Sequence, residues 1–192
     1  MPSAAPLART APRRTDSRIT RDRLIESVGT WVAANGTAPR RLADLTELAD
    51  VSVATAYRHF ASIDDVVRMY VLRLPEQAAQ RFAHGDRADH DPRDRFHRWN
   101  RAWVRASIDQ GSVAVHLRSA RGFLERRAER EATVAFVCDH VEPLLGPLVD
   151  DLIPALVVWN AVSDPREVLD LHHTTKWSQE RVARFVTERT LA

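Results

Sequence analysis

Apolar residues recur along most of this chain at intervals of three and four, the spacing of one face of an α-helix. Residues 20–35 show this spacing clearly and are predicted to form a helix. Asn35-Gly36 marks its end, because both residues tolerate the left-handed conformation. No segment alternates apolar and polar residues as a half-buried strand does, so the pattern predicts an all-α protein. The buried face of this first helix, which Thr20 can cap, is expected to comprise Leu24, Ile25, Val28, Trp31 and Val32.

Residues 41–63, RLADLTELADVSVATAYRHFASI, contain two short helical patterns with a tight turn between them. Asp50 stands at the turn, where a residue must tolerate positive φ. Ser52 suits the N-cap of the second helix because its hydroxyl can accept a bond from a free backbone N–H, and Ala56 and Phe60 then face inward. Two short helices that cross over such a turn form a helix-turn-helix, whose second helix fits the major groove of DNA, although a corner of this kind can also occur without DNA.

The residues of this stretch follow the order Leu45-Thr46, Ala49-Asp50-Val51-Ser52, Thr55-Ala56-Tyr57-Arg58-His59-Phe60 and Ser62. This order closely resembles the DNA-binding signature of the tetracycline-repressor-like (TetR-type) bacterial transcriptional regulators, over roughly residues 20–67. The resemblance implies a homodimeric repressor that binds a palindromic operator in double-stranded DNA and is released by a small molecule. Two positions depart from the pattern: Ile63 stands where many relatives carry a phosphate-binding lysine, and Arg41 where they often carry a capping Thr.

We expect the helix over residues 52–59 to enter the major groove, where Val53 and Thr55 face base edges. Other side chains of this region are expected to hold phosphates and to fix the position of the helix. Residue 63 begins a further helix, whose free N-terminal N–H groups can also receive a phosphate. The DNA contacts predicted besides Val53 and Thr55 are Arg40, Arg41, Ser52, Tyr57, Arg58, His59 and Ser62.

Charge is distributed unevenly, although the net charge is only +2. Residues 1–19 are rich in Pro, Ala and Arg, cannot bury a core and are predicted to be disordered. They form either a solvated tail or a basic arm that lies on phosphates or enters the minor groove. The sequence thus predicts a disordered arm over 1–19, a three-helix DNA-binding domain over 20–67 and a helical domain over 68–192 for dimerisation and ligand sensing.

Helical patterns also fill residues 68–192, broken by Pro75 and by the polar stretch 84–92. We expect helices over 93–110 and 113–120, one long helix from Arg121 to Leu145, and three further helices after residue 150. Asp164-Pro165 is a strong helix start signal. A single helix-turn-helix reads only a few base pairs, so a homodimer is predicted through the apolar faces of the last helices.

Aromatic residues at helical spacing in this domain either fill the core or line a pocket with a few polar groups. The resemblance implies that a pocket exists, and the aromatic content favours a small apolar or aromatic ligand, whose identity the sequence does not give. The candidate ligand-binding residues are Trp99, Asn100, Trp103, His116, Phe123, Phe136, Trp159 and Asn160.

Several other function classes find no support in the sequence. Cys138 is the only cysteine, so neither an intrachain disulfide nor a multi-cysteine metal site can form. The His and Asp residues of 84–92 match no metal-ligand spacing, and neither a glycine-rich phosphate loop nor a Gly-x-Ser-x-Gly elbow is present. We expect no enzyme, cofactor, metal or membrane partner, and a cytoplasmic location. The alternative is a dimeric scaffold or small-molecule binder that has lost DNA binding, which Ile63 and the weak net charge favour.

Overall fold

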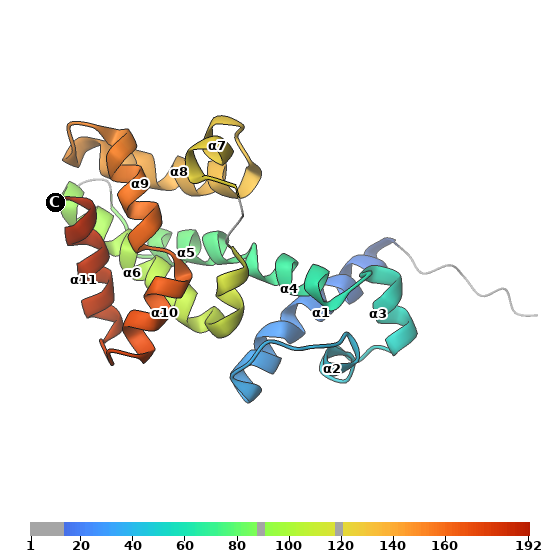
Figure 1. Cartoon of the computed structure of the whole chain (residues 1–192). Helices are drawn as coiled ribbons and strands as arrows, with labels where there is room; N and C mark the ends of the chain where they lie inside the picture. The colour runs from blue at the N-terminus through green and yellow to red at the C-terminus, as the bar shows by residue number, and fades with distance from the viewer. Residues whose placement is uncertain (1–13, 88–90, 118–120) are drawn as a thin grey trace, which may run out of the picture.

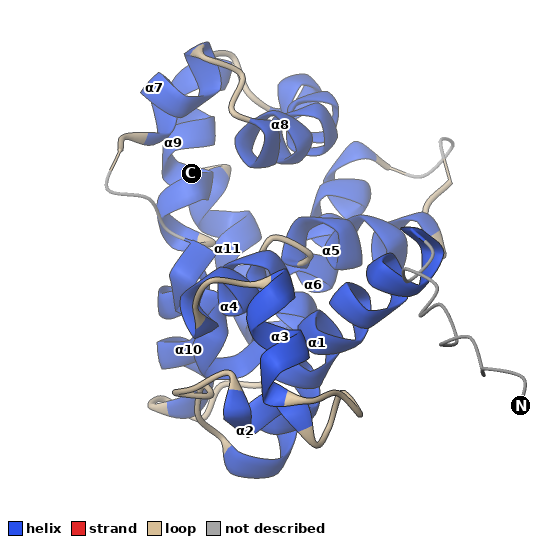
Figure 2. Cartoon of the chain, turned by 90° about the vertical axis from the view of Figure 1, so that its right-hand side faces the viewer, coloured by secondary structure: helices blue, strands red, loops and turns tan. Residues whose placement is uncertain are grey.

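The computed structural model describes residues 14–87, 91–117 and 121–192, except for the side chains of 14, 15 and 115–117. Figure 2 shows that the elements in these ranges are helices, which confirms the all-α prediction. The elements in chain order are α1 (Arg14–Asn35), α2 (Ala43–Thr46), α3 (Val53–His59), α4 (Ile63–Val71), α5 (Leu74–Ala83), α6 (Pro92–Gln110), the 3₁₀ helix η1 (Gly111–Leu117), α7 (Phe123–Ala128), α8 (Ala132–Leu145), the 3₁₀ helix η2 (Gly146–Leu148), α9 (Leu152–Val162), α10 (Pro165–His173) and α11 (Gln179–Thr190).

The helices form two bodies, which Figure 1 shows at opposite ends of the molecule. The N-terminal unit comprises α1 to α4, and the C-terminal body comprises α5 to α11. α4 leads from one to the other, and α5 follows it after a break at Leu72 and Arg73. Pro75 lies in the first turn of α5, as expected of a residue that cannot continue a preceding helix.

The N-terminal unit has its own core, in which the predicted apolar stripe of α1 is buried against α2, α3 and α4. One of its buried members comes from outside the unit: Val113 belongs to η1 and is fully buried among the residues of α1 and α4. The N-terminal unit is therefore completed by the C-terminal body. The other buried residues of this core are Leu24, Ile25, Val28, Val32, Leu42, Leu45, Ala49, Ala56, Phe60, Val66, Val67, Tyr70 and Val71.

α1 begins earlier than the sequence predicted. It starts at Arg14, so residues 14–19 are helical and the prediction of disorder is wrong for them. Thr20, the expected cap, lies inside the helix, where its hydroxyl donates to the Asp16 carbonyl at 2.8 Å. No proline or glycine interrupts the sequence here, and Arg18 faces Asp22 at i,i+4 spacing, which favours a longer helix. Residues 1–13 lie outside the described residues.

The long helix predicted from Arg121 to Leu145 is also wrong, because α7 and α8 are separate helices. Between them Arg130 adopts a positive φ of 52°, which ends α7. The Glu131 N–H donates to the Arg126 carbonyl, while the Arg126 guanidinium binds the Glu131 carboxylate. The backbone hydrogen bond and the ion pair together close the turn between the two helices.

The C-terminal body is built around α6, which packs on α5, α8 and α11. Trp99, Phe96 and Leu156 lie at its centre and are fully buried. Asp164 caps α10 by accepting the Arg166 N–H, as the start signal predicted. This body provides the cavity described below. Its η1 packs against α1 and α4 of the N-terminal unit.

Candidate DNA-binding surface and ligand cavity

The predicted helix-turn-helix is formed by α2, α3 and the turn between them. Asp50 has a φ of 53°, and the Val51 N–H donates to the Thr46 carbonyl at 3.0 Å. Ser52 caps α3: its hydroxyl accepts the Thr55 N–H at 3.1 Å. Ala56 is completely buried and fixes α3 to the unit. The turn, the Ser52 cap and the buried Ala56 therefore place α3 at the position that the sequence predicted.

α3 presents two large side chains to the outside. Val53 is 44% exposed and Tyr57 is 58% exposed, at i and i+4 on one face of the helix. Arg58 is also exposed, while His59 and Thr55 are half-buried. The Thr55 hydroxyl lies 2.9 Å from the Ser52 hydroxyl, so both belong to the cap. The outer surface of α3 is therefore formed mainly by Val53, Tyr57 and Arg58.

The start of α4 is fixed by a capping box. The Ser62 hydroxyl accepts the Asp65 N–H at 3.2 Å, and the Asp65 carboxylate accepts the Ser62 N–H at 3.0 Å. Ser62 is thus engaged within the helix start that was predicted for it. Ile63, which replaces the lysine of many relatives, is half-buried and packs against the core of the N-terminal unit. It adds packing where those relatives carry a cation.

Asp44 holds Arg40 and Arg41 in place, although the sequence did not predict this role for it. The Asp44 carboxylate accepts both backbone N–H groups, at 3.1 and 3.0 Å, and binds the Arg41 guanidinium at 2.9 Å. Burial raises the pKa of Asp44, but these hydrogen bonds and the adjacent positive charge together lower it by more than burial raises it. The pKa of Asp44 therefore lies below its usual value. An acid three residues after Arg41 thus orders the chain that leads into α2, while α2 itself has no side-chain N-cap hydrogen bond.

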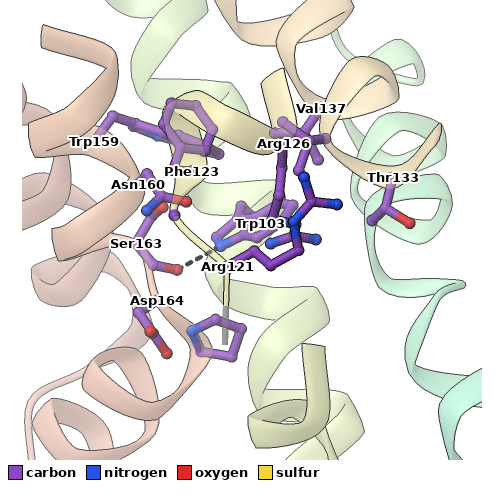
Figure 3. A pocket seen from close by; sticks show the side chains of 13 residues that line it. Trp103, Arg121, Phe123, Arg126, Thr133, Val137, Trp159, Asn160, Ser163 and Asp164 are labelled. Carbon is purple, nitrogen blue, oxygen red and sulfur yellow. Dashed lines mark hydrogen bonds between the residues drawn. The ribbon is translucent and has the colours of Figure 1, made fainter. Parts of the chain in front are cut away.

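A second candidate site is a cavity of about 370 Å³ in the C-terminal body, enclosed by α6 to α10 (Figure 3). Four of the predicted ligand residues line it: Trp103, Phe123, Trp159 and Asn160. The tryptophan rings meet edge to face, with centroids 5.4 Å apart. The remaining lining residues were not predicted from the sequence; they are Arg121, Gly122, Arg126, Thr133, Val134, Val137, Ser163, Asp164 and Pro165.

Three other predicted ligand residues lie apart from this lining. Trp99 is fully buried in the core, against Phe82 and Trp103. Asn100 is also fully buried, where it accepts the Trp159 indole N–H at 2.8 Å and donates to the Thr187 hydroxyl at 3.0 Å. Phe136 packs on His140, with ring centroids 4.5 Å apart. His116 belongs to η1, and its side chain lies outside the described residues.

Charged side chains are the feature of the cavity that hydrophobic periodicity could not identify. The Arg126 side chain is only 12% exposed, and its Nε and Nη2 donate to the two Glu131 oxygens, each at 2.7 Å. These hydrogen bonds hold the pKa of Glu131 below its usual value. Arg121 binds Glu125 and Glu129 at 2.9 and 2.6 Å. The charged run that precedes α8 is the sequence feature that could have indicated these two arginines.

The described residues offer little other chemistry. Cys138 is buried, which together with the nearby Glu142 raises its pKa to about 11, so its thiol is protonated at neutral pH. Within the described part of the chain, His, Cys, Asp and Glu form no group of three or more that could hold a metal. Nor do the described helices include one with the length and apolar character needed to span a bilayer.

Comparison with solved structures identifies the fold. The TetR-like transcriptional regulator LfrR from Mycobacterium smegmatis, solved with proflavine, matches at a TM-score of 0.59 and 14% identity over 91% of this chain and 96% of that one. The multidrug binding protein EbrR, solved with imidazole, matches at 0.59 and 21% over 96% of each chain. A TetR family transcription regulator from Marinobacter aquaeolei VT8 matches at 0.56 and 16%, over 93% of this chain and 96% of that one.

These structures define the class: the chain has the fold of TetR-like transcriptional regulators along almost its whole length. The N-terminal unit with its helix-turn-helix and the helical C-terminal body are both parts of that fold. Protein-family models and curated proteins give no match to the sequence.

Proposed function

We propose that this protein is a dimeric DNA-binding transcriptional regulator of the TetR type, a repressor that leaves its operator when a small molecule occupies the cavity. The observation that carries the proposal is the outer face of α3, where Val53 and Tyr57 are exposed on a capped and anchored helix. In the major groove Val53 can contact a thymine methyl group, and the Tyr57 hydroxyl can reach a phosphate. The resemblance of residues 41–63 to the TetR signature supports the same assignment.

Dimerisation is proposed to occur through α9 and the neighbouring C-terminal helices. Ile153, Val157 and Val158 lie on one face of α9 and are 39, 40 and 38% exposed. A second copy of the chain would remove this apolar face from water, since a two-fold interface uses the same patch on both subunits. The two α3 helices of such a dimer would contact half-sites ~34 Å apart.

Ligand release is proposed to act through α6, which reaches from the cavity to α4. Trp103 of α6 lines the cavity, and Gln110 at the end of the same helix donates to the Tyr70 carbonyl of α4 at 3.3 Å. A ligand that prefers the DNA-incompetent position of α4 would shift the population away from DNA. The fold neighbours solved with proflavine and imidazole support a small aromatic molecule as the ligand.

A mobility shift with the DNA that flanks the gene of this protein tests the DNA-binding proposal. We expect a ligand-free shift at low salt that weakens steeply as salt rises, because phosphate contacts release counterions. Tyr57→Ala should weaken binding at least about tenfold, the effect of losing a contact to the DNA. Leu124→Ala is the control, since Leu124 is similarly exposed but lies on α7. If no flanking DNA shifts, the scaffold alternative is favoured, and full binding by Tyr57→Ala would refute our placement of α3.

Light scattering after size-exclusion chromatography tests the dimer. Val157→Arg places a charge in the proposed interface and should convert a dimer to a monomer, with unchanged helical circular dichroism because Val157 is exposed in the single chain. The matched control is Leu124→Arg, which adds the same charge on α7. A variant Val157→Arg that remains dimeric would place the interface elsewhere.

A further inference from the structure

We infer that the cavity binds an aromatic anion, a flat ring system that carries a carboxylate or similar acidic group, and that Arg126 selects its charge. The inference deepens the function proposed above and rests on it for the role of the cavity as the effector site. It depends on three features of the lining: aromatic faces without available N–H groups, arginine side chains in the wall, and an acidic residue that is already bound.

The aromatic walls select shape but supply few hydrogen bonds. Trp103 and Trp159 are almost fully buried at 4 and 2% exposure, and Phe123 adds a third ring (Figure 3). The Trp103 indole N–H donates to the Ser163 carbonyl at 2.8 Å, and that of Trp159 donates to Asn100. With both N–H groups engaged, the tryptophans can contact a ligand only through ring atoms, which suits an aromatic molecule. Its polar group must be recognised by other residues.

Arg126 has the geometry to recognise an acidic group. Arg126 is one of the lining residues, and Glu131 holds its guanidinium by Nε and Nη2, which leaves the Nη1 N–H groups as donors for a ligand oxygen. Glu131 is not part of the lining, so it fixes the guanidinium from outside the cavity. Arg121 also lines the wall, where Glu125 and Glu129 bind it. A fixed guanidinium that is only 12% exposed is a strong partner for a carboxylate.

A cationic ligand would find a poorer partner. Of the lining residues that the structure describes, Asp164 alone is acidic. Its Oδ1 accepts the Arg166 backbone N–H at 2.9 Å, and its Oδ2 binds the Arg166 guanidinium at 3.2 Å. Aromatic rings do attract cations, but the Arg126 guanidinium in the same wall repels them. The balance of these effects favours an anion.

Three naphthalene derivatives of one shape test the charge preference in the DNA-free protein. 2-Naphthoate, 2-naphthamide and 2-naphthamidine carry negative, zero and positive charge on nearly isosteric groups, and calorimetry gives each Kd. We expect naphthoate to bind at least about tenfold more tightly than the amide, as a hydrogen bond to a charged group predicts, and the amidine to bind most weakly. Equal binding of acid and amide, tightest binding of the amidine, or no binding of any of the three would overturn the inference.

Variants of two adjacent arginines assign the selectivity. Arg126→Gln should abolish the preference for the acid, and Arg126→Lys should restore part of it. Arg127→Gln is the matched control, because Arg127 lies on the same helix, pairs with Glu142 at 2.8 Å and does not line the cavity. An acid preference that survives in Arg126→Gln would refute the role of Arg126. The mobility shift without ligand remains a separate test, so failure of this inference is distinguishable from failure of DNA binding.

Discussion

Gly29 of α1 lies against Tyr70 of α4, so its replacement by Ala gains helix propensity but loses packing. An added Cβ would lie 2.6 Å from the Tyr70 hydroxyl oxygen and 3.1 and 3.2 Å from two ring carbons. Tyr70 is only 8% exposed, so its ring cannot swing freely aside. The first of these distances is shorter than any ordinary van der Waals contact, and α1 and α4 must separate to relieve it.

The two opposing effects can be compared in size. Ala in place of Gly inside a helix contributes roughly 0.5–1 kcal/mol of stability. Overpacking of a closely packed core costs typically about 1–3 kcal/mol. We therefore expect Gly29→Ala to lower the free energy of unfolding by about 1 kcal/mol, which corresponds to a Tm lower by roughly 2–4 °C for a chain of this length.

Thermal and urea denaturation followed by circular dichroism measure this effect. Tyr70→Phe removes the atom of the closest contact, so Gly29→Ala should destabilise the Tyr70→Phe variant less than it destabilises the wild type. Thr30→Ala, at an exposed position of the same helix, reports propensity alone. A Gly29→Ala protein more stable than wild type, or a penalty unchanged when Tyr70→Phe is also present, would refute the packing argument.

Three further predictions concern side chains that are buried or hydrogen-bonded. The Cys138 thiol should react very slowly with a disulfide reagent at pH 8 in the native protein and rapidly in urea, because at a pKa of about 11 only about one thiol in a thousand is ionised. Asn100→Ala should lower stability by about 2–3 kcal/mol in urea denaturation, since it leaves the Trp159 N–H without its buried partner. Asp44→Asn replaces the charge-assisted hydrogen bonds of this carboxylate with neutral ones and should cost about 1 kcal/mol at pH 7. The pKa of Asp44 is lowered by folding, so its stabilising effect is present above about pH 4 and disappears as the pH falls through the folded value; stability curves of the two proteins should therefore converge in acid.

Features set by local chemistry could be predicted from the sequence. The positive φ of Asp50 and the caps at Ser52, Ser62 and Asp164 each depend on residues within a few positions of one another. The helix-turn-helix could be identified because its turn, its cap and its inward-facing Ala56 all agree. Such features require no knowledge of the packing partner.

Features that depend on distant partners could not be predicted. Trp99 and Trp103 stand four residues apart on α6, but Trp99 is enclosed by Phe82 and His140, whereas Trp103 borders the cavity. Their sequence spacing alone cannot distinguish these environments. Arg126 and Glu131 stand only five residues apart, but their pairing requires the turn at Arg130, and the place of Arg126 in the cavity wall depends on the distant lining residues Trp103 and Trp159.

Val113 has a consequence for how this protein can be divided and recombined. Because a fully buried side chain of η1 completes the core of α1 and α4, the N-terminal unit carries a vacancy when it is cut away after α4. A chimaera that joins this N-terminal unit to the C-terminal body of another protein of this fold would keep its stability only if the new partner supplies an apolar residue of similar size at this point. Exchange of domains between such proteins is thus limited by the fit of one valine.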